Sequence, residues 1–247
     1  MTTLLTTGLR LELDRIRLSY TGEPVVDGLS LTVQPGEILV LTGPSGCGKS
    51  TVLRALAGLL KPDAGRVLAD DELVTTTSRD RGMVFQDSAL LPWRTVRSNI
   101  ELALQLRGVP RAGRRERAER WIDEVGLTGF ADFLPKSLSG GMRQRVQLAR
   151  GLAGAPRAVL MDEPFGALDA KTRTAMQHLL IDTWQAHPTT IVFVTHDVDE
   201  ALALGDRVAV LGRAGQPLRA LLDVPSPRDA DVPRTELRAE ILGALHQ

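Results

Sequence analysis

The stretch Gly43-Pro44-Ser45-Gly46-Cys47-Gly48-Lys49-Ser50-Thr51 matches the phosphate-loop pattern GxxxxGK[ST]. A continuous apolar segment at 37–43 precedes it and predicts a buried strand, and a periodic apolar pattern after Lys49 predicts a helix. Glycines let backbone N–H groups point inward at a phosphate, and the helix N-terminus adds positive potential. The order strand, loop, helix therefore predicts an α/β domain that binds a nucleotide.

The loop side chains have separate expected roles. Lys49 should reach the β- and γ-phosphates, and the hydroxyl of Ser50 should ligate Mg²⁺. Cys47 occupies a free position of the pattern, so we expect it to offer its backbone N–H, with a reactive thiol as the alternative. The residues expected to contact the nucleotide are Gly43, Ser45, Gly46, Cys47, Gly48, Lys49, Ser50 and Thr51. A tight turn at a helix start is the alternative for the whole loop.

The composition limits the class of protein. The chain has 247 residues, 43% of them hydrophobic, and 30 basic residues balance 30 acidic ones, which argues against a general nucleic-acid binder. One cysteine excludes a disulfide framework, and four scattered histidines give no zinc spacing. The N-terminus lacks a signal-peptide pattern, and no apolar run approaches the roughly 18 residues of a membrane span. We therefore expect a soluble protein that acts at a membrane only through a partner.

Strand and helix patterns divide the chain. We expect strands at 11–20, 29–33, 37–43, 65–70, 82–85, 158–161, 190–195 and 207–211, and a helix from Lys49 to Pro62. Between 87 and 137 the β-branched runs give way to an arginine-rich helical pattern, which we interpret as a helical insertion with a solvated basic face. The tail after Asp223 ends in a short amphipathic stretch with Leu237, Ile241, Leu242 and Leu245 on one face.

Two carboxylates end the apolar strand at 158–161. Ligands of open α/β sheets lie at the carboxyl ends of the strands, so Asp162 can hold the Mg²⁺ of a bound nucleotide and Glu163 can act as general base. His196 ends another strand at the same edge and is a candidate contact of the γ-phosphate. Gln86, after the strand at 82–85, is neutral and is expected to position metal or water. The alternative for the two carboxylates is an ordinary solvated strand end, and the alternative for His196 is a structural histidine.

The stretch LSGGMRQR at 138–145 places two glycines at the start of a predicted helix. Ser139 is a good N-cap, and Met142, Val146, Ala149 and Ala153 form one apolar helical face. The residues therefore allow a capped helix of ordinary function. Ser139 with the N–H groups of Gly140 and Gly141 also forms an anion site, although the phosphate loop already supplies one.

Together these motifs resemble the nucleotide-binding subunit of ABC transporters over about residues 10–222. The resemblance rests on GPSGCGKST, VFQ, LSGGMRQR, VLMDEP, the ALD ending at Asp169, and THD, in that order. It implies a P-loop NTPase (RecA-like) core at 1–86 and 146–222, an antiparallel β subdomain, an inserted α-helical subdomain at 87–145, and a tail at 223–247. It implies ATP and Mg²⁺ as ligands and ATP hydrolysis as the activity.

The resemblance also assigns roles to single residues. It implies that Tyr20 stacks on adenine, that Glu163 is the catalytic base, that His196 is the switch at the γ-phosphate, and that Gln86 couples the metal to the insertion. In this family two subunits face head to tail, so Ser139, Gly140 and Gly141 would contact the ATP of the partner subunit. Asp169 would reach across the same homodimer.

A finer resemblance lies in the segment Leu90-Leu91-Pro92-Trp93 after Gln86. It is similar to the corresponding segment in importers of nitrate, sulfonates and taurine, and also in importers of thiamine precursors. It implies a cytoplasmic subunit, peripheral on the inner face of the cell membrane, that contacts an integral membrane permease and indirectly a solute-binding protein. Three other activities are weighed against an importer: a soluble ABC-type ATPase of iron–sulfur assembly or DNA repair, a P-loop phosphotransferase, and a non-catalytic nucleotide-binding module.

Overall fold

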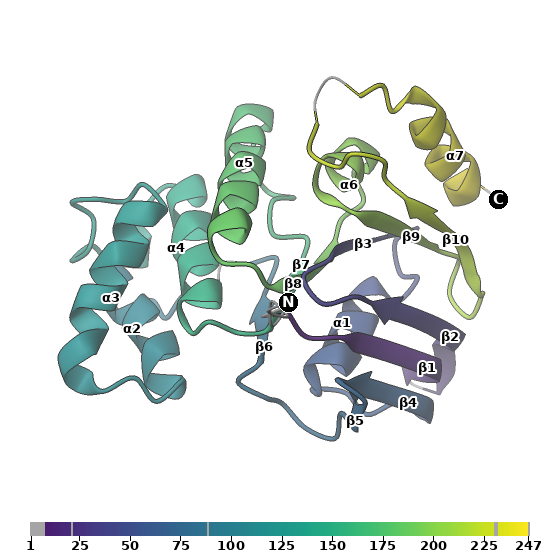
Figure 1. The fold of residues 1–247 in the computed structure, drawn as a ribbon, viewed down its shortest axis with the longest axis horizontal. Coiled ribbons are helices and arrows are strands. Elements are labelled where there is room, and N and C mark those ends of the chain that lie inside the picture. The colour runs from purple at the N-terminus through teal and green to yellow at the C-terminus, as the bar shows by residue number, and fades with distance from the viewer. Residues whose placement is uncertain (1–7, 21, 88, 230–231, 247) are drawn as a thin grey trace, which may run out of the picture.

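The computed structural model describes residues 8–20, 22–87, 89–229 and 232–246, without the side chains of Tyr20 and His246 (Figure 1). Its central element is a six-stranded sheet in the order β10-β9-β3-β8-β7-β6. Strands β6 to β9 and β3 run parallel, and β10 joins β9 in antiparallel pairing. The strands are β3 (Ile38–Thr42), β6 (Arg81–Val84), β7 (Ala158–Asp162), β8 (Thr190–Val194), β9 (Arg207–Leu211) and β10 (Leu218–Asp223).

The sheet is buried on both faces because successive side chains of a strand point in opposite directions. In β3, Leu39 and Leu41 pack into one hydrophobic core and Ile38 and Val40 into another. All four side chains are fully buried. This explains why the segment shows a continuous apolar run with no alternation in the sequence.

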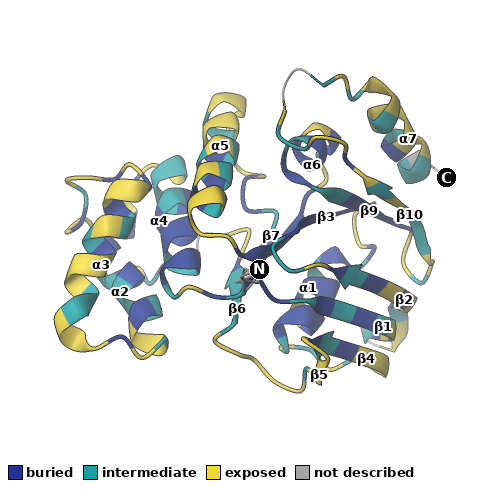
Figure 2. Cartoon of the chain, in the orientation of Figure 1, coloured by how far each residue is buried: buried dark blue, intermediate teal, exposed yellow. Residues whose placement is uncertain are grey.

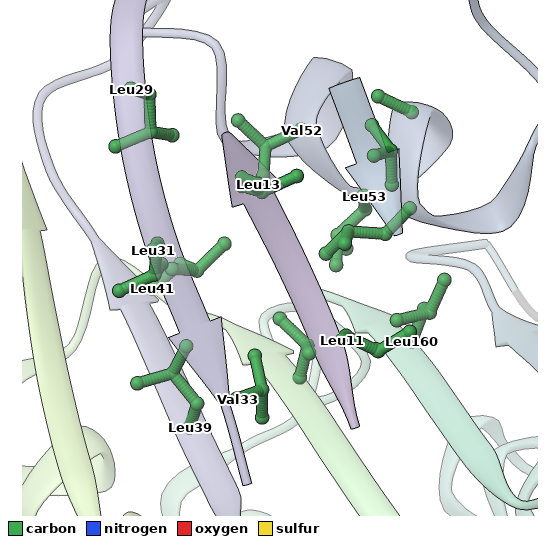
Figure 3. Packing of buried hydrophobic residues seen from close by; sticks show 14 of the residues in the cluster. Leu11, Leu13, Leu29, Leu31, Val33, Leu39, Leu41, Val52, Leu53 and Leu160 are labelled. Carbon is green, nitrogen blue, oxygen red and sulfur yellow. The ribbon is translucent and has the colours of Figure 1, made fainter. Parts of the chain in front are cut away.

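A smaller antiparallel sheet covers one face, in the order β2-β1-β4-β5. Its strands are β1 (Leu11–Tyr20), β2 (Glu23–Val33), β4 (Ala64–Ala69) and β5 (Glu72–Leu73). Helix α1 (Lys49–Ala57) lies between the two sheets, and Figure 3 shows Val52 and Leu53 of this helix among leucines of both sheets. This core fixes the helix whose N-terminus carries the phosphate loop.

Helices cover the other face of the large sheet: α5 (Ala170–Ala186), α6 (Val198–Leu204) and α7 (Thr235–His246). Helix α7 is the expected amphipathic end of the tail. Its Ile241 is fully buried, and Leu237, Leu242 and Leu245 pack against the same core. The tail therefore covers the domain, against α6, β9 and β10.

The insertion forms a helical layer, a name we keep for α2 (Val96–Leu106), α3 (Arg111–Glu124), the short 3₁₀ turn η1 (Pro135–Ser137) and α4 (Gly140–Ala153). Figure 1 shows this layer beside the sheets, and Figure 2 shows many exposed residues on its helix α3. The division expected at 145/146 falls inside α4. This helix packs Val146 and Ala149 into the helical layer but Leu148 and Leu152 onto the large sheet, so it joins both parts.

The structure corrects two expectations about single elements. Helix α1 ends at Ala57 and not near Pro62, because Gly58 adopts a left-handed C-cap with φ 77° and its N–H bonds to the Ala55 carbonyl. Leu59 consequently lies 56% exposed. Strand β10 was not expected at all, because its half-exposed residues lack a clear alternation. The fold class itself, an α/β P-loop NTPase core with an antiparallel sheet and inserted helices, is confirmed.

Candidate nucleotide-binding site

A hollow of about 400 Å³ opens at the N-terminus of α1. Its walls come from three separate segments that the parallel sheet brings to one edge: the phosphate loop, the end of β7 and the end of β8. The lining residues are Ser45, Gly46, Gly48, Lys49, Ser50, Thr51, Glu163 and His196. Six of the expected nucleotide contacts therefore lie together with the expected base and switch.

Backbone carbonyl groups of the loop hold the Lys49 side chain in place. Its Nζ donates to the carbonyl oxygens of Gly43, at 2.8 Å, and Pro44, at 3.0 Å. Gly48 has φ 97°, and a Cβ there would lie 2.6 Å from Cγ2 of Val26. Only glycine fits this position, which sets the direction of the first helical N–H groups. Lys49 is thus a buried cation with carbonyl partners and a place for an anion in front of it.

The surroundings of Cys47 argue against a reactive thiol. Its side chain is 3% exposed, and burial raises the pKa of the thiol, although the Lys49 ammonium nearby opposes the shift. A thiol with a raised pKa carries little thiolate at neutral pH. Neither Cys47 nor Gly43 is among the described residues that line the hollow. Both shape the loop from behind.

The expected metal ligands Ser50 and Asp162 are in contact. Ser50 Oγ donates to Asp162 Oδ1 at 2.8 Å, which joins the end of the loop to the end of β7. Burial raises the pKa of the Asp162 carboxyl, and the neighbouring Glu163 charge acts in the same direction. A partly buried carboxylate beside a hydroxyl is an oxygen-donor set of the kind that Mg²⁺ prefers. The residues therefore fit a magnesium ion.

Glu163 is held in an unusual backbone conformation next to His196. Its φ is 42°, in the left-handed region, although it is not glycine and proline follows it. Its N–H bonds to the Val194 carbonyl at 3.1 Å, which ties the end of β7 to β8. Its Oε2 lies 3.2 Å from Nδ1 of His196. A strained, well-held carboxylate at a site edge is consistent with a catalytic role.

Gln86 lies apart from this hollow. It is exposed, and its side chain is not among the described residues that line the walls. Helix α4 instead holds the backbone of its loop: Gln144 Nε2 donates to the Gln86 carbonyl at 3.3 Å, and Gln147 Nε2 to the Phe85 carbonyl at 2.8 Å. Sequence reasoning missed both glutamines. Their spacing of three on a helix that also packs on the sheet was the available signal.

Asp169 caps helix α5 by accepting from the Thr172 N–H at 3.0 Å. The hydrogen bond from the Thr172 hydroxyl, together with this N–H bond, lowers the pKa of the Asp169 carboxyl. Arg173, one turn along α5, was not singled out from the sequence. Its guanidinium donates to the Leu168 carbonyl at 3.0 Å and contacts the Asp197 carboxylate at 3.3 Å. Arg173 thereby joins the segment before Asp169 to the residue that follows His196.

The residues Ser139, Gly140 and Gly141, which we call the signature, lie at the N-terminus of α4, outside the hollow. Ser139 caps the helix by accepting from the Met142 N–H at 3.2 Å, and both Ser139 and Gly140 are exposed. The two glycines differ in their surroundings. A Cβ on Gly141 would lie 2.7 Å from Thr172 Cγ2, whereas a Cβ on Gly140 would have no neighbour nearer than 3.9 Å. Packing therefore explains Gly141 and leaves Gly140 free for another purpose.

One expectation remains without structural detail. The side chain of Tyr20 lies outside the part of the chain that the structure describes, so its stacking on adenine stays a prediction. Of the loop after Gln86, Leu90 is buried in the helical layer, whereas Trp93 is 74% exposed.

No helix among the described residues is both long and apolar enough to cross a membrane.

Comparison with known proteins identifies the family of this arrangement. A family model described as ABC transporter matches residues 26–166. An ABC transporter ATP-binding protein of Methanocaldococcus jannaschii is 48% identical over 225 residues, covering 89% of this chain and 84% of that protein. The nitrate import ATP-binding protein NrtD of Synechocystis is 42% identical, covering 90% and 84%. The taurine import ATP-binding protein TauB of Yersinia pestis is 47% identical, covering 78% and 75%.

A solved structure gives the same result for the fold. A dimeric ATP-binding cassette bound to ADP and phosphate superposes with a TM-score of 0.77 at 32% identity, covering 87% of this chain and 99% of that one. The matched region of the family model contains the phosphate loop, the signature and the acidic end of β7. The site geometry and the comparisons thus point to the same class of protein.

Proposed function

Because the chain belongs to the ABC transporter family of ATP-binding subunits, in the branch that includes nitrate and taurine importers, we propose that it hydrolyses ATP to drive uptake of a small anionic solute. The proposed solute is nitrate, an alkanesulfonate or a taurine-like compound. It would pass through a separate membrane permease, to which a solute-binding protein would deliver it. The ATPase would lie on the cytoplasmic side of the membrane as a peripheral subunit. The observation that carries the proposal is the single hollow shared by the phosphate loop, Glu163 and His196.

The loop residues would bind the nucleotide. Residues of the phosphate loop and Lys49 line the hollow, and their backbone N–H groups and the Lys49 ammonium would hold the β- and γ-phosphates. Ser50 and Asp162 would hold Mg²⁺, with Gln86 approaching when the helical layer moves. Bound magnesium neutralises phosphate charge as it develops. Tyr20 at the end of β1 would stack on the adenine.

Glu163 would accept the proton of the attacking water. It lies at the edge of the hollow, and its contact with His196 Nδ1 orients both side chains. His196 is the more exposed of the two, at 66% against 23% of the side chain, so it can turn toward a γ-phosphate. General-base catalysis of this type typically contributes about 10²–10⁴-fold to the rate.

The signature would complete the site of a second subunit. Ser139, Gly140 and the α4 N-terminus present N–H groups to solvent, away from the chain's own phosphate loop. A head-to-tail homodimer would place them on the partner's γ-phosphate, with Asp169 at the contact. Closure would then depend on γ-phosphate, and hydrolysis would reopen the dimer. The matched cassette structure is described as dimeric, which supports this arrangement.

The conservative substitution Glu163→Gln tests the ATPase proposal. We expect hydrolysis to fall by about 10²–10⁴-fold while ATP still binds and the ATP-bound dimer persists. Glu124→Gln is the matched control, because Glu124 pairs with His187 at 2.9 Å far from the phosphate loop. Phosphate release and light scattering measure the two effects. Turnover of Glu163→Gln at the wild-type rate would remove Glu163 from the role of base.

Trp93 would contact the permease, since it is the exposed large hydrophobic residue of its loop while Leu90 forms core. Trp93→Ala should weaken association with the membrane subunit and leave ATP affinity unchanged. The opposite pattern, a loss of ATP affinity with unchanged association, would refute this docking assignment.

A soluble ATPase outside transport is the second candidate, and it predicts no stimulation of hydrolysis by any membrane subunit.

A further inference from the structure

A second hollow, of about 520 Å³, lies where the helical layer meets the β6 edge of the large sheet. Its walls come mainly from β6 and from the C-terminal halves of α2 and α4, and Figure 1 shows β6 on the side of the sheet that faces the helical layer. It shares none of its lining residues with the hollow at the phosphate loop. We call it the sheet-edge hollow and define it by Arg81, Leu102, Leu106, Arg150, Gly154 and Pro156 on its walls.

Close packing of α4 on β6 shapes the sheet-edge hollow. A Cβ on Gly151 would lie 2.9 Å from Cγ2 of Val84, and a Cβ on Gly82 would lie 3.3 Å from the Gly151 carbonyl oxygen. The helix therefore lies directly on the strand. Gly154 has more room, since its Cβ would have no neighbour nearer than the Ala103 carbonyl oxygen at 3.6 Å. The result is a preformed concavity within the roughly 300–1,000 Å³ that is usual for small-molecule sites.

Two arginines on its walls have no carboxylate partner. Arg81 of β6 and Arg150 of α4 form no ion pair within the described part of the chain, whereas Arg107, on the same walls, pairs with Asp80 at 2.5 Å. Burial lowers the pKa of both unpaired guanidinium groups, although the Asp80 charge opposes the shift for Arg81. Guanidinium groups stay protonated in proteins, and a partly buried charge is stabilised by a counter-ion. The hollow therefore favours an anion.

Both guanidinium groups are anchored by one contact and keep other donors. Arg81 Nη2 donates to the Thr76 carbonyl at 2.6 Å, while its Nε is buried with no hydrogen-bond partner among the described residues. Arg150 Nη1 donates to the Ala89 carbonyl at 2.8 Å. A guanidinium group has five N–H donors, so a single contact orients it without using it up. An oxyanion would satisfy the buried Nε of Arg81 with a charge-assisted hydrogen bond.

Two leucines of α2 form an apolar wall beside these arginines. Leu102 and Leu106 are four residues apart and therefore lie on the same side of the helix. The core of the helical layer uses another side of α2, with Ile100 and Leu104. Leu106 is 61% exposed. Apolar walls with a few convergent polar groups are typical of sites for small organic ligands.

We propose that the sheet-edge hollow binds a small organic anion, with its oxyanion group at Arg81 and Arg150 and its apolar body against Leu102 and Leu106. An inorganic anion would leave the two leucines uncovered. An uncharged apolar compound would leave the two arginines without a counter-ion. The proposal is independent of the proposed function, because this binding requires neither ATP nor a second subunit.

The test uses octanoate, a carboxylate with an apolar chain, titrated into the full chain by isothermal titration calorimetry. Arg150→Gln should weaken octanoate binding about tenfold, the usual scale for loss of a hydrogen bond to a charged group. Arg145→Gln is the matched control and should change binding less than twofold. Arg145 lies on the same helix and donates to the Val125 carbonyl at 2.7 Å, but it is not among the walls.

A second pair of variants tests the location without removing charge. Gly154→Leu keeps both arginines and places a side chain in the hollow beside Ala103, so it should also weaken octanoate binding at least tenfold. Gly113→Leu is its control, because a Cβ on Gly113 of α3 would have no neighbour within 4 Å and Gly113 does not line the hollow. Thermal unfolding of each variant checks that the fold is intact.

Acetate and octanol separate the two halves of the ligand. Each should bind at least tenfold more weakly than octanoate, because acetate lacks the apolar body and octanol lacks the charge. Absence of saturable octanoate binding to the wild-type chain would overturn the proposal, as would equal effects of Arg150→Gln and Arg145→Gln. Octanol that binds as tightly as octanoate would contradict the role of the arginines. Unchanged binding by Gly154→Leu would contradict the location.

Discussion

The two glycines of the signature should respond in opposite directions to the same substitution. In Gly140→Ala the new Cβ has no neighbour within 3.9 Å, and the φ of Gly140 is not in the left-handed region. Alanine in a helix is favoured over glycine by up to about 1 kcal/mol. For a chain of this size such a gain raises the unfolding temperature by at most about 2–4 °C. In Gly141→Ala the Cβ would lie 2.7 Å from Thr172 Cγ2, and overpacking of this kind costs about 1–3 kcal/mol.

The effect of Gly140→Ala on ATP-driven dimerisation should differ from its effect on stability. The exposed Gly140 would approach the partner's phosphate in the proposed dimer, so its methyl group should weaken ATP-driven dimerisation while stability is kept or improved. The assay combines thermal unfolding with light scattering of the Glu163→Gln background in the presence of ATP. Intact dimerisation of Gly140→Ala would refute the proposed phosphate contact. Destabilisation of Gly140→Ala as large as that of Gly141→Ala would refute the packing argument.

Three further predictions concern other parts of the chain. Glu200 is 5% exposed, and burial raises the pKa of its carboxyl above 4.5, so its ionised form destabilises the fold at neutral pH. Glu200→Gln can still accept the hydrogen bond from Gln177, and it should stabilise the protein at pH values above the folded-state pKa. This advantage should be lost below pH 4.5, as urea unfolding across pH would show. Ile241→Ala should cost roughly 2–5 kcal/mol in the same assay, because the side chain is fully buried, whereas a loosely attached tail would show no change. Ser50→Ala should abolish the gain in ATP affinity that Mg²⁺ provides and leave binding in EDTA unaltered; a retained gain would exclude Ser50 as a ligand.

The sequence was sufficient for the parts of the site that lie on regular elements. The phosphate loop, Asp162, Glu163 and His196 each lie at or just after the end of a buried strand, and parallel strands bring their carboxyl ends to one edge. Contacts between elements that are far apart in the sequence were harder to predict. The link from Arg173 to Asp197 depends on how helices pack, for which a single sequence shows no pattern. The spacing of Gln144 and Gln147 was a signal, but it did not show that these side chains hold the Gln86 loop.

Local patterns failed where another effect was stronger. The leucine spacing in α1 continues to Leu60, but the left-handed Gly58 ends the helix first. Strand β10 is half-exposed at the end of the sheet, so it has neither a continuous apolar run nor a regular alternation. In the loop at 90–93 the sequence could not separate Leu90 from Trp93, because both are large and apolar. Only the packed structure shows that one is core and the other surface.

In the proposed dimer, each ATP is held between the phosphate loop of one subunit and the signature of the other. Mixing two defective variants in the Glu163→Gln background tests it directly. A Lys49→Ala chain has a damaged loop and an intact signature, and a Ser139→Arg chain has the reverse. If the site is shared, the mixed pair contains one complete site, and we expect ATP-dependent dimers that retain one nucleotide, whereas neither variant alone forms them. If the mixture retains no more ATP-bound dimer than the separate variants, the shared site is contradicted.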